Sequence, residues 1–78
     1  MHNIIYEGFE IEALPSQLLN GKWDAGVQIS LRHGTQEHIR LFIGKGLFDT
    51  QQEAVRHALN LGRLIIDGKI PACSVADL

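Results

Sequence analysis

The feature that most constrains the fold is a run of alternating side chains at residues 23–32. The apolar members of the run occupy every second position: Trp23, Ala25, Val27, Ile29 and Leu31. A period of two places all of them on one face of an extended strand, whereas an α-helix would spread them around its circumference. The run therefore predicts a β-strand with one face in the core.

Two shorter segments on either side of this run show the same period. Residues 9–13, before the run, alternate between apolar side chains and glutamates. Residues 38–43, after the run, form the other alternating segment. In the latter we expect one set of side chains to face the core: Ile39, Leu41 and Ile43. The predicted turn between the run at residues 23–32 and the segment at residues 38–43 is His33-Gly34-Thr35. Because short connections make neighbouring strands antiparallel, the three segments predict a meander.

A helix is predicted after the third strand. Thr50 and Glu53 have the spacing of a capping box, in which the hydroxyl of the first residue accepts from the backbone N–H of the second. Apolar residues then recur at spacings of three and four as far as Ile66, and Gly68 follows as a C-cap. We expect one core between sheet and helix that buries Trp23, Val27, Ile29, Leu41 and Ile65.

These segments predict an α+β fold: a three-stranded antiparallel β-meander followed by one α-helix packed on one sheet face (β-β-β-α), with a short C-terminal tail. The 78 residues form one small domain, with its core in residues 4–68 and its tail in residues 69–78. A domain of this size buries only about 60% of the surface that its unfolded chain exposes. We therefore expect a partner subunit to add stability.

Composition argues against several classes of protein. The net charge of −2 lacks the basic excess that is typical of nucleic-acid binders, and Cys73 is the only cysteine, so no disulfide forms within the chain. The N-terminus lacks the basic and apolar leader of a secretory signal, and no stretch approaches the roughly 18 apolar residues of a membrane span. These features predict a cytoplasmic protein.

No residue pattern predicts catalysis, a metal site or a cofactor site. The four histidines, His2, His33, His38 and His57, lack the cysteine pair or HExxH pattern that accompanies zinc sites. Glu10 and Glu12 share a strand face, as solvated carboxylates do, and Gly44-Lys45-Gly46 lacks the spacing of a phosphate-binding loop. We therefore interpret the protein as a non-enzyme without cofactors.

Two sets of residues are candidates for binding a partner. The first would lie on the sheet face opposite the helix and contact nucleic acid or protein: Arg32, His38, Arg40 and Phe42. The second is apolar, lies outside the main helix stripe or in the tail, and would bury itself in a homodimer: Leu59, Leu64, Val75 and Leu78.

The sequence also resembles that of a known protein family. The residues that carry the resemblance are Tyr6, Phe9, Ile11, Ala13, Pro15, Ala25, Gly26, Ile29, Gly34, His38, Phe42, Ile43, Phe48, Ala54 and the run Ile65-Ile66-Asp67-Gly68. Over residues 6–68 the chain resembles the small bacterial proteins known as HlyU-type haemolysin activators and their uncharacterised relatives. The resemblance implies a role in transcriptional regulation. The order of three strands and one helix also resembles antitoxin domains of the HicB type.

Together these observations favour a non-enzymatic protein–protein interaction or regulatory module that self-associates. The alternative is a nucleic-acid-binding transcriptional regulator that uses the sheet face around Arg32, Arg40 and Phe42.

Overall fold

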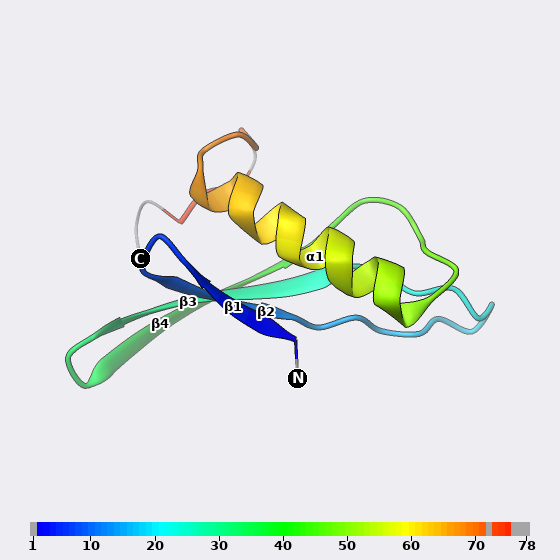
Figure 1. Cartoon of the computed structure of the whole chain (residues 1–78), viewed down its shortest axis with the longest axis horizontal. Helices are drawn as coiled ribbons and strands as arrows, with labels where there is room; N and C mark the ends of the chain where they lie inside the picture. Colours follow the sequence, from blue (N-terminus) through cyan, green and yellow to red (C-terminus); the bar gives the residue numbers. More distant parts are fainter. Residues whose placement is uncertain (1, 72, 76–78) are drawn as a thin grey trace.

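The computed structural model describes residues 2–71 and 73–75, which fold into an antiparallel sheet with a helix across one face (Figure 1). The sheet has four strands in the order β1-β2-β3-β4. Their bounds are Asn3–Tyr6 for β1, Phe9–Ala13 for β2, Gly26–His33 for β3 and Gln36–Ile43 for β4. The helix α1 spans Gln51–Ile66 and packs against β1, β2 and β3. The α+β class is confirmed, but the predicted count of three strands is wrong.

The additional strand is β1, which pairs with β2 from Asn3 opposite Glu12 to Tyr6 opposite Phe9. A two-residue turn joins the strands, and both of its residues have positive φ, 53° at Glu7 and 84° at Gly8. Glycine adopts this conformation readily, whereas glutamate seldom does. The turn is therefore hard to recognise in the sequence, and β1 was missed with it.

The central strand β3 confirms the inner face that the alternating run predicts. Val27 and Ile29 are fully buried. The regular strand begins only at Gly26, because Trp23 forms isolated bridges with Gln17 and Phe48 instead of joining the sheet. Trp23 is half-buried, so its predicted place in the core is only partly correct.

The orientation of β4 is opposite to the prediction. Its register with β3 places Phe42 beside Val27 and Arg40 beside Ile29, so these side chains share the face that carries the helix. The residues expected in the core lie on the other face and are 47%, 66% and 74% exposed at Ile39, Leu41 and Ile43.

The length of the hairpin turn explains this reversal. A three-residue turn at residues 33–35, as predicted, would pair Val27 with Leu41. The structure pairs His33 with Gln36, so the turn contains only Gly34 and Thr35. Because side chains alternate between faces, a shift of one residue moves every side chain of the strand to the other face.

The helix begins as the capping box predicts. The Thr50 hydroxyl oxygen accepts from the Glu53 backbone N–H at 3.1 Å and lies 3.2 Å from the Glu53 carboxylate, to which it donates. At the other end Asp67 is the C-cap, and Gly68 adopts a φ of 76°. The buried stripe consists of Ala54, Val55, Ala58, Gly62 and Ile65.

The described part of the tail folds back onto the core. Val75 is only 6% exposed and packs with Ile29 and Ile65, accompanied by the half-buried Ile70 and Cys73. This burial corrects the prediction that Val75 lies at an interface with a second copy. Within residues 2–71 and 73–75, no helix has the length and apolar character needed to cross a membrane.

The orientation of β4 predicts a contrast between two alanine substitutions. Ile29→Ala should lower the free energy of unfolding by about 2–5 kcal/mol, because it leaves a cavity in the core. Leu41→Ala should change it by less than about 0.5 kcal/mol, because Leu41 is exposed in the single chain. Urea unfolding at a concentration where the chain is monomeric tests this contrast. Equal losses for both variants would contradict the orientation of β4.

Gly62 supplies a second stability prediction. A Cβ atom added at this position would lie 2.5 Å from Ile11 Cγ2, far inside van der Waals contact. Gly62→Ala should therefore lower stability by about 1–3 kcal/mol, even though alanine favours the helix by about 1 kcal/mol. Asn60→Ala, at an exposed position of the same helix, is the matched control and should be neutral or stabilising. Thermal melts that show Gly62→Ala to be stabilising would refute this close packing.

Candidate interaction surface

The sheet face opposite α1, here called the open face, divides into a polar part and an apolar part. The register places these residues on it: Asn3, Ile5, Glu10, Glu12, Gln28, Ser30, Arg32, Glu37, Ile39, Leu41 and Ile43. Strands β2 and β3 contribute mainly carboxylates, amides and hydroxyls. The apolar part lies along β4, where Ile39, Leu41 and Ile43 follow one another at every second position.

Strand β4 is also an edge of the sheet. The Gly44 backbone N–H donates to the Ala25 carbonyl oxygen at 3.0 Å, so the even-numbered residues of this segment direct their backbone groups toward β3. In an antiparallel ladder the intervening residues direct theirs the other way. The N–H and C=O groups of Glu37, Ile39, Leu41 and Ile43 therefore point outward from the edge. Figure 1 shows the β3–β4 hairpin extending past the end of α1, which leaves this edge accessible.

A hollow of about 200 Å³ adjoins the apolar part of β4. Its lining is mostly apolar and includes Leu14, Gly26, Leu41, Phe42 and Ile43, with Ser16 and Asp24 at its polar side. Leu14 is itself 40% exposed. The apolar surface of β4 thus continues onto the segment that follows β2.

The structure does not bring together the first set of candidate residues. Arg32 lies on the open face, where its guanidinium is 3.8 Å from the Glu37 carboxylate. His38, Arg40 and Phe42 lie on the opposite face of the sheet. Phe42 packs against the core, and the His38 ring meets the His33 ring edge to face at 5.5 Å. The shared sheet face on which the nucleic-acid hypothesis depended is therefore not formed.

The second set does not form an exposed apolar patch. Leu59 is half-buried against the core, Leu64 is half-buried, and Val75 is buried. Leu78 lies outside the described residues. The exposed apolar side chains are instead those of β4, which the sequence analysis had placed in the core. A two-residue turn at Gly34-Thr35 was the signal that would have identified them.

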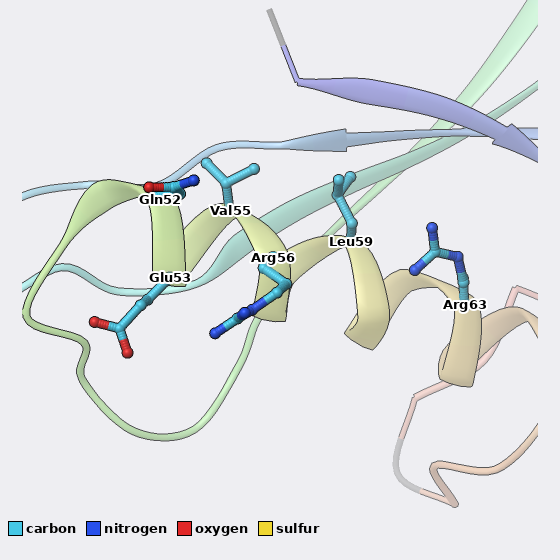
Figure 2. Close-up of a pocket in the computed structure, with 6 residues that line it drawn as sticks. All are labelled: Gln52, Glu53, Val55, Arg56, Leu59 and Arg63. Atoms are coloured by element: carbon cyan, nitrogen blue, oxygen red, sulfur yellow. The ribbon is translucent and has the colours of Figure 1, made fainter.

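The described residues contain no group of three or more histidine, cysteine or carboxylate side chains able to hold a metal ion. A hollow of about 520 Å³ runs along α1. Figure 2 shows that Val55, Leu59 and Arg63 point toward the sheet, whereas Glu53 and Arg56 point away from it.

The pKa of the Tyr6 hydroxyl is raised above its ordinary value. The Tyr6 hydroxyl donates to the Asp67 carboxylate, with both oxygens at 2.9 Å, and so joins β1 to the end of α1. This hydrogen bond is the main cause of a raised pKa at Tyr6, because it stabilises the neutral phenol. Desolvation and the negative charges of Asp67 and Glu7 raise this pKa further, while Arg63 opposes the shift.

Comparisons of this chain with protein-family models, curated proteins and solved structures found no match. The resemblance to HlyU-type proteins therefore stays a prediction.

The Tyr6 hydrogen bond predicts a loss of stability in alkali. Because the folded-state pKa of Tyr6 is raised above its usual 10.0, the bond contributes fully below about pH 10 and is lost as the pH rises through the raised pKa. Tyr6→Phe removes the phenol and with it this contribution. The difference in urea midpoint between wild type and Tyr6→Phe should be constant from about pH 8 to about pH 9 and should shrink as the pH rises above about 10. A difference that stays constant with pH would contradict the assignment.

Proposed function

We propose that this protein is a non-enzymatic interaction or regulatory module that acts as a homodimer and associates through the exposed edge of β4. The observation that carries the proposal is the coincidence, on one strand, of outward-pointing backbone groups and three exposed apolar side chains. An exposed, apolar edge strand is a template for pairing with another strand. The homodimer predicted from the sequence is retained, but its interface is now proposed at β4.

The length of β4 favours it over the other edge. β4 contains eight residues, whereas β1, at the opposite edge, contains four. On the open face β1 carries a single exposed apolar side chain, Ile5. Pairing through β4 therefore forms more backbone hydrogen bonds and covers more apolar surface.

The small size of the domain supports association as well. The fully buried large side chains are only Ile11, Val27, Ile29 and Ile65 among the described residues. A core of this size gives limited stability, and a second copy that binds only the folded chain adds to it by mass action. A twofold dimer is the simplest closed arrangement, because one surface serves both subunits.

Other observations are compatible with a binding role. Glu10 and Glu12 lie on the open face, where Glu10 borders a hollow of about 260 Å³ together with Arg32 and Glu37. A free cysteine, Cys73, is compatible with action in the reducing cytoplasm. The resemblance to HlyU-type proteins, carried by residues such as Phe9, Ile29 and Phe42, would make the role a regulatory one.

Sedimentation equilibrium from low to high micromolar concentration tests self-association. We expect the wild-type protein to form dimers. Leu41→Lys places two ammonium groups at the centre of the proposed interface and should raise the dimer dissociation constant at least about tenfold.

Leu19→Lys is the matched control, because Leu19 is fully exposed in the segment between β2 and β3 and lies outside the proposed interface. This variant adds the same charge and should dimerise like the wild type. A wild-type protein that stays monomeric at high micromolar concentration would overturn the proposal.

A further inference from the structure

We infer that the two copies pair antiparallel through β4 in one register, with Leu41 opposite the partner's Leu41, and that Glu37 of each copy pairs with the partner's Lys45. The inference rests on the proposed self-association and specifies its geometry. The first ground is the set of backbone groups that point outward from β4. The second is the order of charged and apolar side chains along β4 and at Gly44 and Lys45, which follow it.

Symmetry first limits the available registers. A twofold axis perpendicular to the sheet pairs the two edges antiparallel and keeps both open faces on the same side. Residues opposite each other then share a face, so outward-pointing odd-numbered residues such as Ile39 and Leu41 oppose odd-numbered residues of the partner. The allowed registers therefore differ in steps of two residues, so that Leu41 lies opposite Ile39, Leu41 or Ile43 of the partner.

Centring the axis on Leu41 matches every apolar residue of the edge. Ile39 then lies opposite the partner's Ile43, Leu41 opposite the partner's Leu41, and Ile43 opposite the partner's Ile39. These three residues also have the outward-pointing backbone groups, so each opposite pair exchanges two backbone hydrogen bonds. Side chains that are 47%, 66% and 74% exposed in the single chain lie against apolar neighbours from the partner.

Charge complementarity supports the same register. The pairing with β3 continues to Gly44, whose N–H donates to the Ala25 carbonyl oxygen, and Lys45 follows in the bend after it. With the axis at Leu41, Gly44 would lie opposite the partner's His38, and the long side chain of Lys45, one residue further on, would reach the partner's Glu37. Glu37 is already 3.8 Å from Arg32 of its own chain, so each carboxylate would have a cation on both sides. The twofold axis creates this pair twice.

The neighbouring registers are less favourable. A shift that centres the axis on Arg40 sets this guanidinium opposite its own copy and Glu37 opposite the partner's Ile43. The opposite shift, with the axis at Phe42, sets Ile39 opposite the partner's Lys45. In the Leu41-centred register, by contrast, Arg40 lies opposite the partner's Phe42, so the two copies of Arg40 do not face each other.

Disulfide trapping tests the register directly. In a Cys73→Ser background, Leu41→Cys should form an intermolecular disulfide with oxidised glutathione, because opposite residues in a hydrogen-bonded pair have Cα atoms about 5.5 Å apart. Ile39→Cys and Ile43→Cys should each stay uncrosslinked alone and should crosslink to each other when mixed. Residues four apart on a strand are about 13 Å apart, beyond the reach of a disulfide. All three positions are exposed in the single chain, so folding is preserved.

Charge reversal gives a second test that needs no cysteine. Glu37→Lys and Lys45→Glu should each raise the dissociation constant about fivefold, because each change affects two symmetric ion pairs. The double variant Glu37→Lys with Lys45→Glu should recover most of the wild-type affinity. Lys69→Glu, at an exposed position beyond α1, is the control and should leave the affinity unchanged.

The outcomes separate this inference from the proposed function. Dimers by sedimentation together with crosslinking at Leu41→Cys and in the mixed pair would support the register. Dimers that crosslink through Ile39→Cys alone, or not at all at these positions, would overturn the register and leave self-association standing. A monomeric wild-type protein would overturn both.

Discussion

The close approach of α1 to β2 is the contact on which the rest of the structure depends. Gly62 faces Ile11 so closely that even a methyl group would overlap with it. This approach lets small residues of the helix, Ala54 and Ala58, lie directly on the inner face of the sheet. One helix seated so deeply covers the middle of the sheet and leaves its opposite face and the end of the β3–β4 hairpin to solvent (Figure 1).

The turn between β3 and β4 then decides what that uncovered surface is made of. A two-residue turn puts Phe42 toward the helix, where it joins both parts of the core. The same turn puts Ile39, Leu41 and Ile43 on the open face. One additional residue in the turn would have exchanged the two faces, burying the aliphatic side chains and exposing Arg40. The chemistry of the candidate surface is therefore set at Gly34-Thr35, several residues from the surface itself.

Sequence reasoning succeeded where one signal dominated and failed where two were balanced. The alternation around Val27 and Ile29 has apolar side chains on one side only, and the Thr50–Glu53 capping box has a fixed spacing, so both were predicted correctly. In β4 both faces carry apolar residues, so the pattern alone does not choose between them. The strand β1 is short, and its turn uses Glu7 at positive φ, which no composition rule signals. The candidate surface was missed because it depends on the face of β4.

In the dimer that we propose, pairing through β4 would give a closed pair of subunits and not a fibre. Once the β4 strands of two copies pair, the edges that remain are both β1. β1 is only four residues long and ends in the tight Glu7-Gly8 turn, and Tyr6 is fixed to Asp67 at the end of α1. Short edge strands offer few backbone groups to an incoming chain, which is one way in which natural sheets avoid edge-to-edge aggregation. The asymmetry between a long apolar edge and a short one would therefore direct the proposed association to a single surface, and a single self-complementary surface closes after two copies.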